Sequence, residues 1–235
     1  MVENKKIALV TGASSGIGSA TAIELAQKNV HVIITGKTLS GLQVTESKIK
    51  LDGGTSTIAQ LDMNDFVGID RLGMEIFKRW GKLDILISNA AVLGILGPLH
   101  HQSSEDFFDV ININLLSNHR LIRSMDALLK KSTFSKALFL SSSMASTPKS
   151  FWGAYAISKA ALNHMVKIWA NENKNNNLSI MIVNPGKTST KMRAKAMPGE
   201  NEKVLQTPEE VAKKIVNLIF LNKVSKGEIF DILQI

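Results

Sequence analysis

The sequence lacks several features that would assign it to other classes of protein. Its 235 residues include no cysteine, which excludes disulfide bonds and cysteine-based metal sites. No apolar run approaches the roughly 18 residues that a membrane-spanning helix needs. The apolar run within the N-terminal stretch MVENKKIALVTG is too short for a secretory signal. The chain also shows no low-complexity linker and no repeat of fixed period. We therefore expect one cytoplasmic domain over residues 1–235, without a membrane partner.

The chain is basic, with a formal net charge of +8 and a pI near 9.6. Such a charge suits nucleic acid, a phosphorylated cofactor or an acidic carrier protein. The lysines are scattered, however, and asparagines accompany them in NENKNNN, residues 171–177. This pattern favours solvated surfaces and argues against a nucleic-acid partner. The adjacent His100 and His101 do not form a metal-binding set with the other three histidines, so we expect no metal site.

Short apolar runs alternate with amphipathic segments of helical length. The runs predict strands at 7–10, 30–35, 56–60, 83–87, 136–140, 178–183 and 228–232. The amphipathic segments predict helices at 16–29, 39–51, 65–80, 104–131, 152–173 and 208–221. This alternation is typical of the α/β class, here a Rossmann-like, doubly wound parallel sheet of about seven strands with helices on both faces. A ligand site is expected beyond the carboxyl ends of the strands.

A glycine-rich turn, TGASSGIG over Thr11–Gly18, directly follows the first predicted strand. Glycines permit a sharp exit from the strand, a close approach to a pyrophosphate and tight packing of the next helix. The N-terminus of that helix offers free N–H groups to phosphates. The turn therefore predicts a dinucleotide site whose loop residues are Gly12, Ser14, Ser15, Gly16, Ile17 and Gly18.

The end of the second predicted strand bears on which dinucleotide binds. An acidic residue there would bind the ribose 2′-hydroxyl of NAD and repel a 2′-phosphate. The sequence VIITGKTLS has no carboxylate at this place and carries Lys37. A lysine suits a 2′-phosphate, so NADP(H) is the preferred cofactor, with NAD(H) possible.

The stretch SSSMASTPKSFWGAYAISK, residues 141–159, pairs Tyr155 with Lys159 one helical turn later. Residues at i and i+4 share a helix face. Because a nearby cation favours phenolate, we expect Lys159 to lower the pKa of Tyr155 from its usual value of about 10. Tyr155 is then the predicted acid/base, and Lys159 would also hold the nicotinamide ribose.

Together these motifs resemble the short-chain dehydrogenase/reductase family, in the branch with TGxxxGxG and YxxxK and especially its bacterial oxidoreductases. The resemblance covers essentially the whole chain and adds Asp62, the Ser88–Ala91 segment, Asn114, Ser142 and the loop from Pro185 to Thr190. Ser88 replaces the asparagine and Ala91 the glycine usual in the Ser88–Ala91 segment. The methyl group of Ala91 is expected to narrow the site near the nicotinamide ribose.

The resemblance implies a role for each matching residue. Ser142 would donate to the substrate oxygen, although Ser141 or Ser143 could point inward instead. Asn114 would act through its backbone carbonyl and a water leading to Lys159. Asn112 is its competitor, and an asparagine that only kinks the helix is the structural alternative. The remaining residues implied at the cofactor are Asp62 at the adenine amino group, Asn89, Ala90, and Pro185, Gly186, Thr188 and Thr190 at the nicotinamide end.

Apolar side chains flank the catalytic segments and predict a pocket for a medium-sized hydrophobic carbonyl compound, or else core or subunit packing. They are Leu93, Leu96, Leu99, Met144, Trp152, Met192 and Met197. The polar segment 191–206, KMRAKAMPGENEK and its flank, is expected to be a mobile lid that excludes water.

The expected function is an NADP(H)-dependent oxidoreductase that interconverts a carbonyl and a secondary alcohol. A 3-oxoacyl-carrier-protein reductase, for which the basic surface would suit an acidic carrier, is the alternative substrate class. A catalytically silent, cofactor-sensing binding protein is the alternative outside enzymes. The resemblance also implies a homo-oligomer, dimer or tetramer, built through the helices at 104–131 and 152–173.

Overall fold

All seven strands run parallel in one sheet, in the order β3-β2-β1-β4-β5-β6-β7. The computed structural model describes residues 5–234. The strands are β1 (Lys6–Thr11), β2 (Val30–Gly36), β3 (Thr55–Gln60), β4 (Ile85–Ser88), β5 (Lys136–Leu140), β6 (Ser179–Asn184) and β7 (Lys226–Asp231). The α-helices are α1 (Gly16–Gln27), α2 (Leu39–Leu51), α3 (Phe66–Trp80), α4 (Ser104–Ile111), α5 (Ser117–Lys130), α6 (Gly153–Glu172), α7 (Lys191–Ala196) and α8 (Pro208–Phe220). This is the predicted doubly wound α/β fold.

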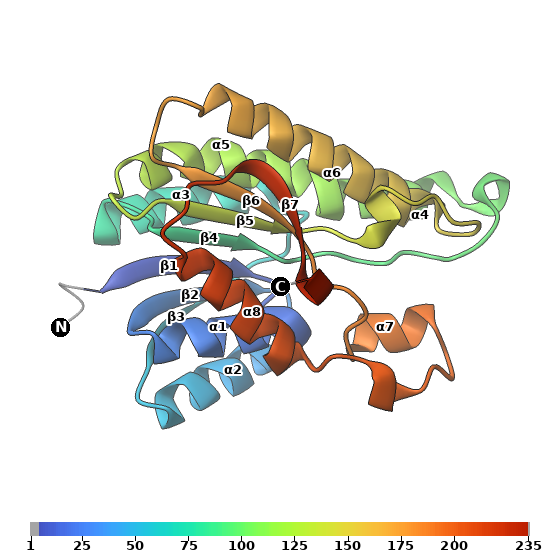
Figure 1. The fold of residues 1–235 in the computed structure, drawn as a ribbon, viewed down its shortest axis with the longest axis horizontal. Coiled ribbons are helices and arrows are strands. Elements are labelled where there is room, and N and C mark those ends of the chain that lie inside the picture. Colours follow the sequence, from blue (N-terminus) through green and yellow to red (C-terminus); the bar gives the residue numbers. More distant parts are fainter. Residues whose placement is uncertain (1–4, 235) are drawn as a thin grey trace.

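Helices cover both faces of the sheet, as Figure 1 shows, with α3, α5 and α6 above it and α1, α2 and α8 below it. Alternate residues of each strand point to opposite faces. Thus Ile85 and Ile87 of β4 belong to the core beneath the sheet, whereas Leu86 belongs to the core above it. The strands are apolar on both sides because both sides are buried.

Successive strands are added to one side of β1 as far as β3 and to its other side from β4 onward. As a result β1 pairs with β2 on one side and with β4 on the other. The crossovers from β1 and β4 therefore leave in opposite directions across the sheet. A crevice opens between the loops that leave the two strands at their carboxyl ends, and ligands of such folds bind there. The loops that carry the predicted site residues all leave this edge.

The helix predicted over 104–131 is instead interrupted. A π-helical turn, η2 (Asn112–Leu116), separates α4 from α5. Asn114, fully buried in this turn, binds the backbone of Val92 in both directions: its Oδ1 accepts from the amide at 2.8 Å and its Nδ2 donates to the carbonyl at 2.9 Å. These bonds tie the helix to the loop after β4, and π-turns of this kind are common at functional sites.

A second difference lies in the segment 191–206, which we expected to be a mobile lid and for which we predicted no helix. It contains the short helix α7, for which Thr190 is the N-cap and accepts a hydrogen bond from the amide of Arg193. The guanidinium of Arg193 binds both carboxylate oxygens of Glu200, at 2.5 and 2.6 Å. Local capping and this ion pair give structure to a sequence that lacks apolar periodicity. Its role as a lid stays a prediction.

The remaining boundaries lie within two residues of those predicted, and the bounds of α2 and β5 are as predicted. His100 and His101 lie in a 3-10 turn, η1 (Leu99–His101). Among the described residues, no helix combines the length and the apolar character needed to cross a bilayer.

Gly18 offers a test of the close packing beneath the glycine turn. A Cβ atom at Gly18 would lie 2.4 Å from the carbonyl oxygen of Gly12 and 2.4 Å from Nδ2 of Asn89. We expect Gly18→Ala to lower the free energy of unfolding by about 1–3 kcal/mol, because backbone atoms cannot move aside cheaply. Urea unfolding measures this. Gly97→Ala is the control, since nothing lies within 4 Å of a Cβ there; equal stability of both variants would contradict the packing described.

Candidate active site

The turn between β1 and α1 is shaped to hold an anion. Gly12 and Gly16 have φ angles of 65° and 57°, in the left-handed region that favours glycine. Ser15, the N-cap of α1, makes no side-chain capping bond, and the first turn of the helix holds no acidic residue. The amide groups of that turn and the positive end of the helix dipole therefore remain available to phosphate groups.

A cavity of about 500 Å³ runs from this turn across the carboxyl ends of the strands. It brings together most of the residues predicted at the cofactor: Gly12, Ser14, Ser15, Gly16, Ile17, Lys37, Asp62, Asn89, Ala90, Tyr155, Lys159, Pro185 and Thr190. Gly18 lies behind its wall, where it packs against Gly12 and Asn89. Ala91 lines the cavity, as the expected narrowing requires.

A second cavity, of about 410 Å³, adjoins the first and shares Tyr155, Ser141 and Thr190 with it. Gly186 and Thr188, predicted at the cofactor, line this second cavity instead. Its apolar wall includes Leu93, Met144, Trp152, Met192 and Met197, as predicted for a substrate pocket. Leu96 packs against the same cluster, whereas Leu99 is 59% exposed and does not line the cavity.

At the adenosine end of the first cavity, Lys37 and Asp62 form an ion pair with 2.8 Å between Nζ and Oδ2. Asp62 also accepts a hydrogen bond from the amide of Asn64, at 3.0 Å. The bond from Asn64, followed by that from Lys37, lowers the pKa of Asp62. Lys37 therefore stands where a ribose 2′-substituent is expected, with its charge partly balanced by Asp62.

Tyr155 and Lys159, both buried, lie on the same face of α6 near its N-terminus, beside the carboxyl end of β5. The Lys159 Nζ atom is 6.0 Å from the centre of the Tyr155 ring and donates to the backbone carbonyl of Leu140 at 2.7 Å. Burial lowers the pKa of Lys159 to about 8. The ammonium is thus held at the junction of strand, helix and cavity.

The expected lowering of the Tyr155 pKa is wrong for the protein alone. Burial raises the pKa of the phenol, and a hydrogen bond with the Ser142 side chain offsets only part of that rise. The physical reason is desolvation, because phenolate would lose its hydration in this buried position. The Lys159 ammonium, which donates to Leu140 and has a lowered pKa itself, does not offset that loss.

The three serines after β5 occupy different positions. All three line the second cavity, and the Ser142 hydroxyl accepts from the amide of Met144 at 3.2 Å and acts on the pKa of the Tyr155 phenol. The Oγ of Ser141 is buried and has no partner among the described residues, and Ser143 is exposed at the start of a 3-10 turn. This geometry favours Ser142 as the serine that acts beside Tyr155.

Asn114 connects to the catalytic helix through its side chain. Its Nδ2 also donates to Ser158 Oγ at 3.0 Å, and that hydroxyl donates to the carbonyl of Tyr155 at 2.7 Å. The Asn114 carbonyl accepts from Asn118 Nδ2 at 2.8 Å. Asn114 thus braces the turn of α6 that carries Tyr155, and the expected link from its carbonyl to Lys159 stays a prediction. Asn112 is only half-buried, which does not favour it as the competitor.

Sequence reasoning missed residues that hold the site without lining it. The buried Thr11 accepts hydrogen bonds from the amides of Asn89 and Ala90, both at 3.0 Å, which joins the loop after β4 to the end of β1. The Ser88 hydroxyl donates to the side-chain oxygen of the buried Asn118. Thr11 and Asn118 show no periodicity or spacing in sequence that would have revealed these bonds.

The fold and the two cavities define a dinucleotide-binding α/β protein with a tyrosine–lysine pair at its centre. The family model described as short chain dehydrogenase matches residues 6–201. The chain is 33% identical over 211 residues to the uncharacterized oxidoreductase YciK of Escherichia coli, covering 88% of this chain and 83% of that protein. The chain therefore belongs to the short-chain dehydrogenase family.

Solved structures agree with this assignment. A short chain dehydrogenase from Salmonella enterica superposes with a TM-score of 0.93 at 31% identity, covering 98% of this chain and 97% of the other. A short chain dehydrogenase from Shigella flexneri, complexed with NADP, gives a TM-score of 0.91 at 32% identity, and the match covers 98% of both chains.

The lowered pKa of Lys159 predicts a pH-dependent stability. The folded protein releases this proton near pH 8, whereas an unfolded lysine titrates at about 10.4, so stability due to Lys159 rises with pH between these values. Without cofactor, Lys159→Met should exceed the parent in free energy of unfolding at pH 7 by on the order of 1–3 kcal/mol. Its advantage should shrink between pH 8 and 10.

Urea unfolding at several pH values measures this difference. The exposed Lys48, changed to Met, is the control and should show no such trend. A difference between Lys159→Met and the parent that stays constant from pH 7 to 10 would contradict the burial of the ammonium.

Proposed function

We propose that this protein is an NADP(H)-dependent oxidoreductase that interconverts a carbonyl and a secondary alcohol. The observation that carries the proposal is the position of Tyr155, which lines both the cavity beside the glycine turn and the adjoining cavity with the apolar wall. A phenol at that junction reaches a substrate in one cavity while the reduced or oxidised cofactor occupies the other.

The residues of the first cavity fit a phosphorylated dinucleotide. Its walls combine the open amides of the α1 N-terminus with glycines that leave room for a pyrophosphate. Lys37 at its far end suits a 2′-phosphate, and the Shigella flexneri structure with NADP supports that preference. Asp62 balances Lys37 only in part, since it also accepts from the Asn64 amide. NADP(H) is therefore the proposed cofactor, with NAD(H) as a weaker ligand.

A bound NADP(H) would supply or accept the hydride. During reduction of a carbonyl, negative charge develops on its oxygen, and a proton donor is needed there. Tyr155 gives that proton through its hydroxyl, and the Ser142 hydroxyl donates a hydrogen bond to the same oxygen. A raised pKa keeps the phenol protonated before the reaction, which suits an acid.

Lys159 keeps a positive charge near the phenol and assists its ionisation as the proton leaves. The bond to the Leu140 carbonyl holds the ammonium in place, and Lys159 lines the first cavity, with further Nζ hydrogens left to donate. We assign these protons to the nicotinamide ribose. Asn114 positions this part of α6 through Ser158 rather than by touching the reactants.

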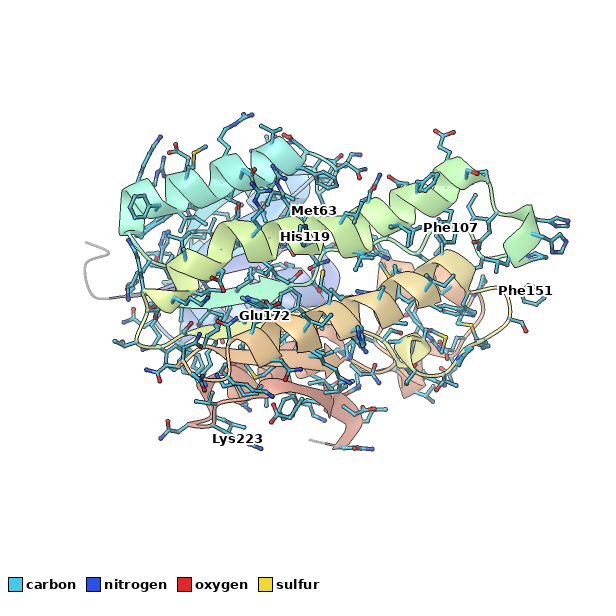
Figure 2. The ribbon with its side chains drawn as sticks, turned by 90° about the horizontal axis from the view of Figure 1, so that it is seen from above. Met63, Phe107, His119, Phe151, Glu172 and Lys223 are labelled. Carbon is cyan, nitrogen blue, oxygen red and sulfur yellow. The ribbon has the colours of Figure 1, made fainter. Side chains whose placement is uncertain are left out.

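Self-association through the outer surfaces of α5 and α6 is also part of the proposal. Ile157 and Ile168 of α6 are 44% and 49% exposed, and Leu116 beside the start of α5 is 42% exposed. Figure 2 shows α3, α5 and α6 side by side over the sheet, so that α5 and α6 form a continuous outer surface. Exposed apolar side chains on such a surface favour a second copy of the chain as their cover.

Tyr155→Phe tests the proposed acid/base directly. The change removes the hydroxyl and keeps the ring against Trp152, whose centre is 5.9 Å from that of Tyr155. We expect turnover of a ketone or aldehyde to fall at least about 100-fold. Binding of NADPH should change less than about threefold, because the phosphate-binding turn is untouched.

NADPH consumption over a panel of ketones, aldehydes and 3-oxoacyl esters measures turnover, and quenching of protein fluorescence measures binding. Unchanged turnover in Tyr155→Phe would remove the phenol from the mechanism. Tight NADPH binding with no consumption over the whole panel by the parent would instead favour a catalytically silent, cofactor-sensing protein.

A further inference from the structure

The second cavity carries charged side chains as well as its apolar wall. Lys149, Lys187 and Arg193 contribute positive charge, and Asp231 contributes negative charge. Which of them is available to a ligand depends on what each already binds.

Three of the four are already engaged. Arg193 forms two bonds with Glu200, and Lys187 lies 3.7 Å from the same carboxylate. Asp231 accepts from the side-chain amide of Asn184 at 3.1 Å and from the amide of Leu233 at 3.0 Å. Their charges are therefore balanced or hydrogen-bonded within the protein.

Lys149 differs from these residues. Within residues 5–234, no carboxylate lies within ion-pair distance of its Nζ atom. The Nζ atom lies 5.9 Å from the centre of the Trp152 ring, which in turn lies 5.9 Å from the centre of the Tyr155 ring. The Trp152 ring thus lies between the Lys149 ammonium and Tyr155, the proposed proton donor, and provides an apolar surface there.

The loop that carries Lys149 is held in place. The backbone carbonyl of Lys149 accepts a hydrogen bond from the amide of Trp152 at 3.3 Å. The carbonyl of Phe151 accepts one from the amide of Gly97 at 3.0 Å. Phe151 has a φ of 73°, a strained value for a residue with a side chain, which persists only where the surroundings impose it. Figure 2 shows Phe151 at the end of the molecule, and its side chain is 58% exposed. The loop thereby directs Phe151 outward while Lys149 and Trp152 line the cavity.

We propose that the second cavity accepts carbonyl compounds whose apolar body carries an anionic group, and that Lys149 binds that group. This rests on the proposed function and narrows its substrate class to oxo acids of moderate length. The carbonyl would lie at Tyr155 and Ser142, and the body would pack on Trp152 and Met144. The separation of Lys149 from Tyr155 suits a spacer of one ring or a short alkyl chain.

A matched pair of probes tests the proposal: 4-acetylbenzoate and its methyl ester, which differ in the negative charge. In Lys149→Gln we expect KM for the acid to rise about 3- to 5-fold, the upper part of the range for a charge pair open to solvent. The kcat for the acid and both constants for the ester should stay within about twofold, because the reacting atoms are untouched. Lys149→Arg should retain the parent's KM for the acid.

Lys48→Gln, which removes one positive charge from the exposed side of α2, is the control for net charge and should leave both probes unaffected. Equal effects of Lys149→Gln on acid and ester, or no effect on either, would overturn the proposal. So would a parent enzyme whose kcat/KM for the ester equals or exceeds that for the acid. If the ester were still turned over in those cases, the result would support the proposed oxidoreductase activity while rejecting the role of Lys149.

Calorimetric binding of two unreactive probes, 4-tert-butylbenzoate and 4-tert-butylbenzamide, separates this proposal from the function itself. We expect the parent to bind the benzoate more tightly and Lys149→Gln to lose that preference, even if no carbonyl compound were reduced. A parent without preference for the benzoate, or a variant that keeps it, would overturn the role of Lys149 whatever the enzyme's activity.

Discussion

The burial of a tyrosine and a lysine on one turn of α6 is the constraint on which the site depends. Both side chains are removed from water, yet the proposed reaction requires a proton from one and a positive charge on the other. Burial disfavours the charged form of both, so the phenol holds its proton more tightly and the ammonium holds its proton less tightly. Their surroundings must compensate, and the carbonyl of Leu140 and the hydroxyl of Ser142 do so in part.

That constraint accounts for polar contacts that would otherwise cost stability in the core. Asn114 interrupts a long helix with a π-turn, and its side chain reaches both Val92 and Ser158. The Ser158 hydroxyl then binds the carbonyl of Tyr155. Buried polar groups of this kind are stable only when each finds a partner. The chain of bonds fixes α6 relative to the loop after β4, which lines the cofactor cavity.

Much of the fold followed from the sequence because buried parallel strands and amphipathic helices have distinct periodicities. The bounds of α2 and β5 were predicted correctly, and the glycine turn and the Tyr155–Lys159 pair lie at the predicted edge of the sheet. Periodicity carried no sign of the break at Asn114, because side-chain bonds to a distant loop cause it. Helix α7 was missed for the same reason, since a cap and an ion pair stabilise it. The predicted direction of the Tyr155 pKa shift was wrong, because sequence spacing shows which residues share a helix face but not how deeply they are buried.

Tyr155 is enclosed, so burial outweighs the nearby lysine in setting the pKa of the phenol in the protein alone. Tyr155 is the single tyrosine of the chain, so its ionisation can be followed by the ultraviolet difference absorbance of phenolate without interference from another phenol. We expect phenolate to form in the native protein only at a higher pH than in the urea-unfolded chain, where it forms near pH ~10. Phenolate that forms in the native protein at a lower pH than in the unfolded chain would show that Lys159 outweighs burial.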